Sequence, residues 1–281
     1  MNPAEAIRSA LVERVRDRFN DRGKGERPVE RSNQALFRPD SVAWRVHGDV
    51  TTMMVGGISA LLVEMLHPLA LGGVWDHSNV GADMTGRLRR TARFIAVTTF
   101  GEKTAAEAAI DKVRRIHERV RGTLPDGREY RADDPALLAW IHVAGSLQFL
   151  EGWIRYGEPG MSNADQDRYF AEAGLIARKL GAHPVPETRA EAEALVRQFR
   201  PELRADDRSA AFRRLVLDAP APSRSEAPLQ KLLMAAAVDL MPRWARTMHD
   251  LRAPLIARPA VRGATFGLAG TLRWAFGGGV R

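Results

Sequence analysis

Apolar residues recur every three to four positions along most of the chain, which is the spacing of an amphipathic α-helix. The first such stretch covers residues 41–67, with Ser41 or Asp40 as its expected N-cap and the His67-Pro68 pair as its break. A second covers residues 85–99. No stretch sustains the apolar–polar alternation of a half-buried strand, so we predict an all-α fold.

Two later segments give the strongest helical signals. Residues 103–121 place their apolar side chains on one stripe, and we expect Gly122 to close this helix in a left-handed conformation. Residues 137–154 are apolar on all sides, which indicates a central buried helix started by Asp133-Asp134-Pro135. Further helix boundaries are expected at Ser162, Gly181 and Thr188.

The chain divides into a polar arm and one large helical domain. Residues 1–32 are rich in charge and predict a short helix and a mobile arm, whereas residues 33–281 predict one multi-helix domain around a cofactor pocket. The N-terminus carries Glu5 and has no continuous apolar core, so we expect a cytoplasmic protein. The last thirty residues are basic and amphipathic, which suggests peripheral contact with an anionic membrane.

The amino-acid composition excludes several classes of metal site and of ligand. None of the 281 residues is a cysteine, which excludes disulfides, iron–sulfur clusters, zinc–thiolate sites and thiolate-ligated haem. The net charge of +8 comes from arginines scattered among 34 acidic residues, so nucleic-acid binding is not expected. Walker loops, dinucleotide-binding glycine motifs and nucleophile elbows are absent from the sequence.

His117 is the leading candidate for a metal ligand. It lies on the apolar stripe of residues 103–121, where several alanines would let a flat macrocycle approach the helix. Neighbouring arginines, Arg121 among them, are suited to pair with haem propionates. The alternative is a core histidine bonded to a backbone carbonyl, and the pattern alone leaves both open. His142, in the apolar helix, is the second choice of ligand.

Arg87, Arg90 and Thr91 fall within about one turn of each other, so two cations and a hydroxyl can converge on one space. Trp44 and His47 lie at the start of the helix expected over residues 41–67 and are candidates for the far wall of a cofactor pocket.

Glu64 and His67 lie one turn apart where an apolar segment ends. A carboxylate in such surroundings acquires a raised pKa and can act as a base. Their Glu-x-x-His spacing also occurs in di-iron half-sites, but the chain has no second copy of it, which argues against a di-iron centre.

Several short motifs, taken in order, resemble the MpaB-type oxygenases, the family that includes the catalytic domain of rubber oxygenases (latex clearing proteins). They are Trp44-x-x-His47, His67-Pro68, His77-Ser78, Gly86-Arg87-Leu88-x-Arg90-Thr91, Arg115-Ile116-His117 and Gly122-x-x-Pro125-Asp126-Gly127. The resemblance covers about residues 35–255. Rubber oxygenases tend to carry lysine where this chain has Arg90. Glu64 is the one well-situated acid for their catalytic glutamate, and their distal lysine has no obvious match, its place falling to Arg45 or His47.

The resemblance implies an all-helical fold around haem b, with His117 as proximal ligand and Arg87, Arg90 and Thr91 as the polar cluster beside the haem. It also implies a reaction in which dioxygen cleaves a C=C bond of a hydrophobic, isoprenoid substrate. The rival interpretation is a non-catalytic helical protein that binds haem or a lipid.

Overall fold

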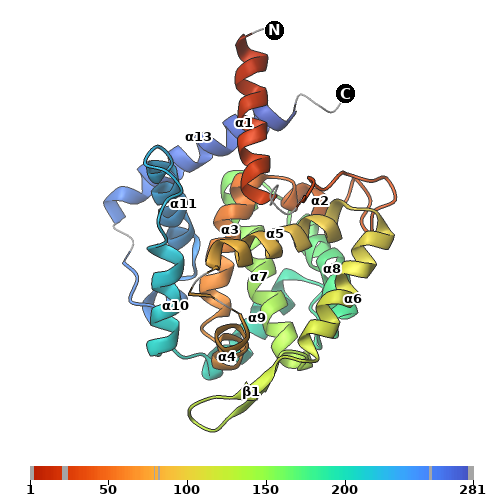
Figure 1. The fold of residues 1–281 in the computed structure, drawn as a ribbon, viewed down its shortest axis with the longest axis vertical. Helices are drawn as coiled ribbons and strands as arrows, with labels where there is room; N and C mark the ends of the chain where they lie inside the picture. The colour runs from red at the N-terminus through yellow and green to blue at the C-terminus, as the bar shows by residue number, and fades with distance from the viewer. Residues whose placement is uncertain (1–2, 21–24, 79, 82, 253–254, 278–281) are drawn as a thin grey trace.

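The computed structural model describes residues 3–20, 25–78, 80–81, 83–252 and 255–277, and helices make up nearly all of its regular structure (Figure 1). The α-helices are α1 (Pro3–Phe19), α2 (Val42–His47), α3 (Val50–Glu64), α4 (Pro68–His77), α5 (Met84–Phe100), α6 (Lys103–His117), α7 (Pro135–Tyr156), α8 (Asn163–Leu180), α9 (Arg189–Phe199), α10 (Asp207–Leu217), α11 (Ala227–Leu240), α12 (Arg243–Met248) and α13 (Arg258–Phe276). Two 3₁₀ turns, η2 (Arg200–Glu202) and η3 (Leu255–Ala257), and an antiparallel hairpin of β1 (Arg121–Thr123) and β2 (Glu129–Arg131) complete the described elements. The prediction of an all-α fold is confirmed.

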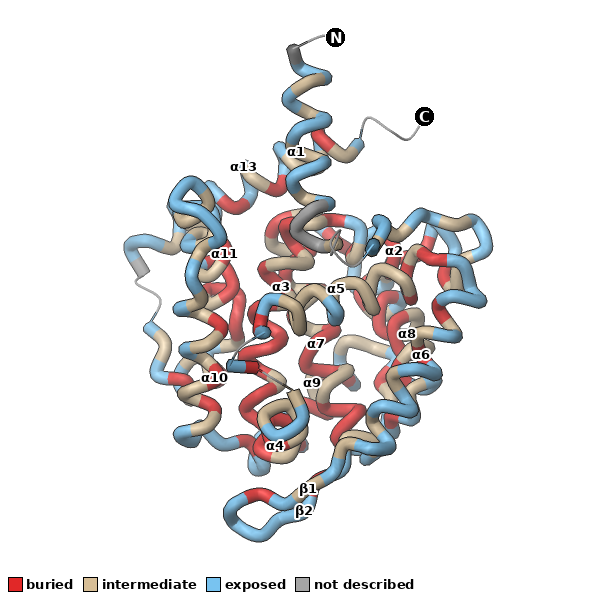
Figure 2. Tube along the Cα trace, in the orientation of Figure 1, coloured by how far each residue is buried: buried red, intermediate tan, exposed pale blue. Residues whose placement is uncertain are grey.

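Helices α3 and α7 form the centre of the molecule, and buried residues concentrate on them (Figure 2). Glycines let the two backbones approach closely. A Cβ atom on Gly56 would lie 2.9 Å from the Gln148 carbonyl oxygen, and one on Gly152 would lie 2.9 Å from that of Thr52. This close crossing places the C-terminal end of α3, where Glu64 lies, against α7.

Several helix boundaries expected from the sequence are confirmed. Asp134, Ser162 and Thr188 each accept a hydrogen bond from a backbone amide three residues later, as N-caps do. Gly181 ends α8 with a φ of 98°, a conformation that glycine adopts without a steric penalty.

The expected continuous helix over residues 41–67 is wrong, because the structure has two helices there, α2 and α3. The chain turns at Gly48, and the Asp49 side chain accepts a hydrogen bond from the Thr52 amide at 2.8 Å. A carboxylate that caps a new helix stabilises this break more than continuation of the first helix would.

The expected end of the helix over residues 103–121 is also wrong. The structure ends α6 at His117, and Gly122 is a strand residue of β1 paired with Tyr130 rather than a left-handed cap. A Cβ atom on Gly122 would overlap the Tyr130 hydroxyl, so the glycine serves close packing within the hairpin. The hairpin strands have three residues each, too few for their alternation to be visible in the sequence.

Helices α1 and α13 lie together at one end of the molecule (Figure 1). Arg8 of α1 donates from Nε to the Ala275 carbonyl at 2.8 Å, and α13 packs along α11 and α3. The polar arm therefore contains the expected helix, while its residues 1–2 and 21–24 lie outside the described part. Among the described helices none is long and apolar enough to span a membrane alone; α3 and α4 meet that criterion only as a pair bent by 105°.

Candidate functional site

Glu64 is the last residue of α3 and faces α7. Its carbonyl accepts a hydrogen bond from the Trp140 indole at 3.0 Å, and a Cβ atom on Gly145 would lie 2.9 Å from the Glu64 Oε1 atom. The absence of a side chain at Gly145 therefore makes room for the carboxyl group. Burial raises the Glu64 pKa from 4.5 to about 7, and the positive charge of Arg87 opposes that rise. Near neutral pH this carboxyl group can both take up and release a proton.

Arg87, in the first turns of α5, is the charge that Glu64 faces. Its guanidinium donates from Nη1 to the Ser78 hydroxyl at 3.1 Å. Burial lowers the Arg87 pKa, whereas Glu64 raises it. Arg87 also acts electrostatically on His117, so the same cation neighbours both the acid and the imidazole.

His117 ends α6 and is partly buried. Its Nδ1 atom is buried without a hydrogen-bond partner, so the expected carbonyl bond of an ordinary core histidine is not formed there. Burial lowers the His117 pKa, the nearby Asp133 raises it, and Arg87 lowers it. A neutral imidazole with an unpaired nitrogen is the form of histidine that binds a metal.

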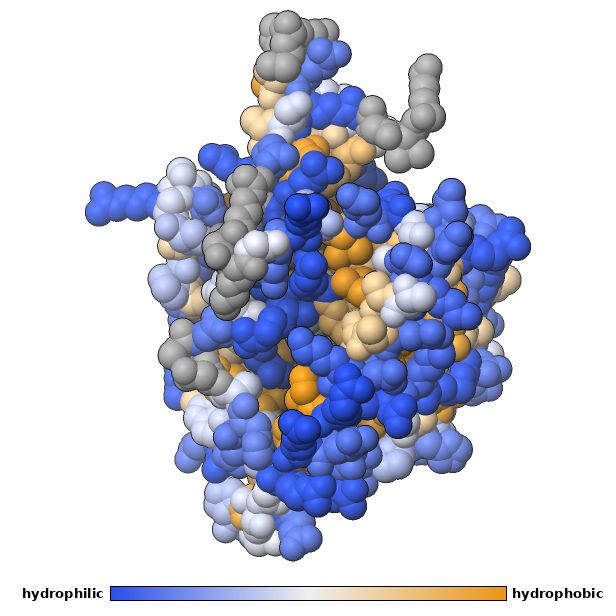
Figure 3. Space-filling model, turned by 45° about the vertical axis from the view of Figure 1, so that its right-hand side comes forward, coloured by the Kyte–Doolittle hydropathy of each residue, from blue (hydrophilic) through white to orange (hydrophobic). Residues whose placement is uncertain are grey.

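The apolar surface beside Arg87 is accessible. Only three residues of α5 are buried, at its two ends, and apolar side chains between them, such as Leu88 and Ile95, stay partly exposed. Figure 3 shows apolar residues, in orange, in the middle of a face that is otherwise mostly polar. A hydrophobic ligand can therefore contact α5 next to the charged group.

The other polar residues expected at this site are more exposed. Thr91 donates its hydroxyl to the Arg87 carbonyl one turn back at 3.2 Å, and Arg90 pairs with Asp83 at 3.0 Å while acting electrostatically on Arg87. Arg121, in β1, donates to the Glu118 carbonyl at 2.6 Å. The structure thus keeps Arg90 and Thr91 next to Arg87 but leaves their side chains largely in solvent.

His67 faces different neighbours from Glu64. It is the residue before α4, it is buried, and its Nε2 atom lies 3.4 Å from a Glu202 carboxylate oxygen. Its ring packs against Trp140 and Phe199. Burial lowers the His67 pKa and Glu202 opposes that shift. The structure does not bring the His67 side chain into the group formed by Glu64, Arg87 and His117.

His47 and Trp44 lie near the opposite end of α5 from Arg87. Both ring nitrogens of His47 are engaged, Nδ1 with the Thr99 hydroxyl at 2.9 Å and Nε2 with the Tyr169 hydroxyl at 3.0 Å. Thr99 follows Arg87 by twelve residues, a helical rise of about 18 Å. Burial lowers the His47 pKa to about 4, which keeps its ring neutral.

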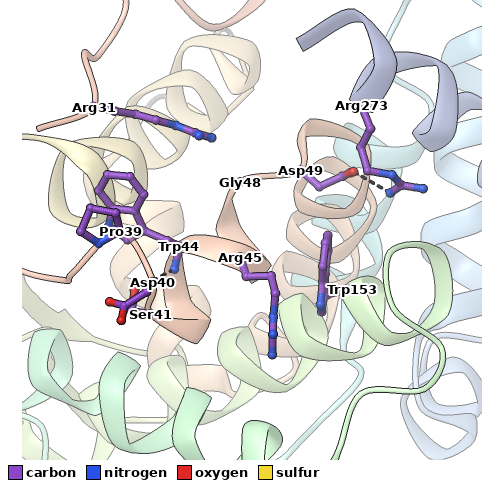
Figure 4. Close-up of a pocket in the computed structure, with 10 residues that line it drawn as sticks. All are labelled: Arg31, Pro39, Asp40, Ser41, Trp44, Arg45, Gly48, Asp49, Trp153 and Arg273. Atoms are coloured by element: carbon purple, nitrogen blue, oxygen red, sulfur yellow. Dashed lines mark hydrogen bonds and ion pairs between the residues drawn. The ribbon is translucent and has the colours of Figure 1, made fainter. Parts of the chain in front are cut away.

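Trp44 lines a cavity of about 360 Å³ at the start of α2 (Figure 4). Its ring meets Phe100 edge-on at 5.2 Å, and Trp153 and Arg273 lie across the cavity. Arg45 also lines the cavity, and its guanidinium pairs with Glu158 at 3.2 Å and with Asp165 at 2.6 Å. This cavity is lined by the segments on either side of α2 and by residues of α2, α7 and α13, and none of the residues grouped around Arg87 lines it.

The model of the family described as "ER-bound oxygenase mpaB/B′/Rubber oxygenase, catalytic domain" matches residues 44–274. The chain belongs to this family. Searches among curated proteins and among solved structures found no significant match.

The mpaB/rubber oxygenase domain thus spans α2 to α13 and contains Glu64, Arg87 and His117. The suspected family is confirmed, and with it an oxygenase-type domain. The matched segment runs further toward the C-terminus than the expected 35–255 and includes most of α13.

Two neighbours of Glu64 and His117 were not predicted from the sequence as part of the site. They are Gly145, which makes room for the Glu64 carboxyl group, and Asp133, which raises the His117 pKa. Gly145 had a visible signal, because a glycine inside a buried helix costs about 1 kcal/mol relative to alanine and usually has a packing reason. Asp133 was noted only as part of a helix start. His142, the second-choice ligand, is another neutral imidazole: burial lowers its pKa to about 4 and its Nε2 atom is unpaired, but its charged neighbour is Arg178.

Proposed function

We propose that this protein is a haem b-dependent oxygenase that cleaves a C=C bond of a hydrophobic, isoprenoid substrate with dioxygen. The observation that carries the proposal is the convergence of Glu64, Arg87 and His117 from three helices, beside accessible apolar surface on α5. An acid with a pKa of about 7, a half-buried cation and a neutral imidazole have little structural use in a bundle core.

The residues present fit a haem. Within the described residues no three His, Asp or Glu side chains are grouped to hold a metal ion, so a metal on His117 would take its remaining ligands from a cofactor. His117, whose buried Nδ1 atom has no hydrogen-bond partner and whose pKa is lowered by burial, would be the residue that holds the iron of a b-type haem. Arg87 and Arg90 supply positive charge for propionates. When bound, haem would supply the iron at which dioxygen is activated.

The chain's own groups have separate tasks in this proposal. Leu88 and Ile95 bind the apolar substrate and exclude water from it. Glu64 takes a proton from a carbon next to the double bond and returns it, which its pKa of about 7 permits at neutral pH. Arg87 stabilises the Glu64 carboxylate formed after release. The balance closes without an added reductant, because one dioxygen and one C=C bond give two carbonyl groups.

The test is turnover by haem-loaded, ferrous protein. We expect a short oligo-isoprenoid incubated with ¹⁸O₂ to give aldehyde or ketone products, and mass spectrometry should detect the label in both carbonyls. Glu64→Gln should abolish these products. Glu118→Gln, an exposed residue directly after α6, is the matched control and should leave them unchanged.

Two outcomes would contradict the proposal. Products that persist in Glu64→Gln would remove Glu64 from the reaction. Haem binding without turnover of any unsaturated lipid tested would favour the rival interpretation, a helical protein that holds haem or a lipid without catalysis.

A further inference from the structure

A second charged cluster lies where α7, α11, α12 and α13 meet, away from the residues around Arg87. Its centre is Asp239 of α11, which is only 4% exposed. Four arginines from the other three helices pair with this one carboxylate. The nitrogen–oxygen distances are 3.2 Å for Arg155, 3.9 Å for Arg246, 3.1 Å for Arg258 and 2.7 Å for Arg262.

The charges in this cluster do not balance. In the part of the chain that the structure describes, Asp239 is the one carboxylate paired with these four guanidinium groups, which leaves an excess of three positive charges. Burial lowers the Arg246 pKa, and the neighbouring Arg258 lowers it further. Unbalanced charge in a partly buried site costs folding free energy unless an anion offsets it.

Three polar atoms in the cluster are also buried without a hydrogen-bond partner. They are Nη1 of Arg246, Nε of Arg258 and the hydroxyl of Tyr156. Tyr156 is 1% exposed, and the Arg155 guanidinium lies close enough to its hydroxyl to oppose the rise in the Tyr156 pKa that burial causes. Arg246 Nη1 and Arg258 Nε both face Asp239 Oδ1, at 3.9 Å and 3.1 Å, but neither contact has hydrogen-bond geometry. Buried donors are nearly always paired in native proteins, so one shared carboxylate leaves these guanidinium groups short of well-aligned acceptors.

The cluster is reachable from solvent on the α13 side. The Arg262 side chain is 47% exposed, and those of Arg155 and Arg258 are each 26% exposed. A tetrahedral phosphoryl group offers several oxygens to guanidinium forks and carries up to two charges, so it offsets the excess better than a monocarboxylate does. Ile256 and Phe266, two exposed apolar residues, flank Arg258 and Arg262 along the chain.

We propose that the arginines around Asp239 form a binding site for a dianionic phosphoryl group. The group comes either from free phosphate or from a phosphomonoester lipid headgroup, whose acyl chains would meet Ile256 and Phe266. The inference does not depend on the oxygenase activity, because none of these residues belongs to the group around Arg87.

The direct test is isothermal titration of the native protein with inorganic phosphate at constant ionic strength, compared with acetate. We expect phosphate to bind and acetate to bind at least about tenfold more weakly, since the second charge meets further guanidinium groups. Equal heats for phosphate and acetate, or none for either, would overturn the proposal.

Phosphate binding by two arginine variants of α13 tests whether the ligand binds at the cluster around Asp239. Arg262→Gln should weaken phosphate binding by about tenfold, the loss expected for one charge-assisted contact. Arg273→Gln, on the same helix but in a one-to-one pair with Asp49 at 2.7 Å, should leave binding unchanged. Asp239→Asn should tighten binding, because it removes the internal competitor. An equal loss in the Arg262 and Arg273 variants would refute the assigned site.

Vesicles distinguish the two sources of the phosphoryl group. Flotation with phosphatidylcholine vesicles that contain phosphatidic acid, but not with phosphatidylcholine alone, and loss of flotation in Arg262→Gln would assign the site to a lipid headgroup. Phosphate binding in the titration without flotation would assign it to a free phosphate. Absence of both would overturn the proposal.

Discussion

Glu64→Gln isolates the cost of holding an ionised carboxylate at the end of α3. Glutamine keeps the size and polarity of the side chain but cannot ionise. The wild-type protein carries the Glu64 pKa at about 7 instead of 4.5 because burial disfavours the charged form. Well below pH 4.5 the Glu64 carboxyl group is protonated in both the folded and the unfolded chain, so there is no charge to bury and no cost.

The free-energy cost of burying the ionised Glu64 grows as pH rises from 4.5, the pKa in the unfolded chain, to about 7, the pKa in the folded protein. Above about pH 7 this cost is constant. A rise from 4.5 to about 7 corresponds to about 3 kcal/mol once the group is ionised. Between about pH 5 and about pH 8 the wild type should therefore lose about 2.5 kcal/mol of unfolding free energy relative to Glu64→Gln. The glutamine variant should be the more stable protein at the alkaline end.

Urea unfolding at a series of pH values, followed by circular dichroism, measures this difference directly. Glu129→Gln, on the exposed face of β2, reports the effect of losing a carboxylate at the surface and is subtracted. A difference between wild type and Glu64→Gln that stays constant across the series would refute the burial of the Glu64 carboxyl group.

Three further substitutions test the same geometry. Arg87→Gln removes the cation that holds the Glu64 pKa down, so in the same urea series the pH at which the cost of burying the carboxylate stops growing should move upward, and the total cost should increase. Gly145→Ala places a Cβ atom 2.9 Å from Glu64 Oε1; because the carboxyl end can move, we expect lower activity with a stability loss of at most about 1 kcal/mol in thermal melts. Gly56→Ala meets the Gln148 backbone at 2.9 Å, so α3 and α7 must separate, and thermal melts should show a loss of about 1–3 kcal/mol.

Local signals in the sequence predicted the helices well where one residue type determines the boundary. Ser162, Thr188 and Gly181 act through their own side chain or backbone freedom, and the structure places helix ends at each of them. Gly122 failed as a signal because its role depends on Tyr130, which reaches it only after the hairpin folds back. A glycine has several uses, and the sequence does not distinguish a helix cap from a close contact.

The sequence pointed to the charged residues of the candidate site, but it did not show which other polar residues lie near them. Arg87 and His117 stood out because charge beside an apolar stripe needs a partner. His47 had the same signal, yet Thr99 and Tyr169 satisfy both of its ring nitrogens, and these partners come from distant parts of the chain. The cluster around Asp239 was invisible for the same reason, since its arginines converge only through tertiary packing.

The absorption spectrum of the purified protein loaded with haem tests the central claim most directly. The account predicts a Soret band of histidine-ligated haem b that is lost or shifted in His117→Ala and unchanged in His142→Ala, which removes another buried imidazole with an unpaired nitrogen. Addition of carbon monoxide to the reduced protein should shift the band further, as expected for an iron with an open distal face. An unchanged spectrum in His117→Ala, or a loss confined to His142→Ala, would contradict the assignment of His117.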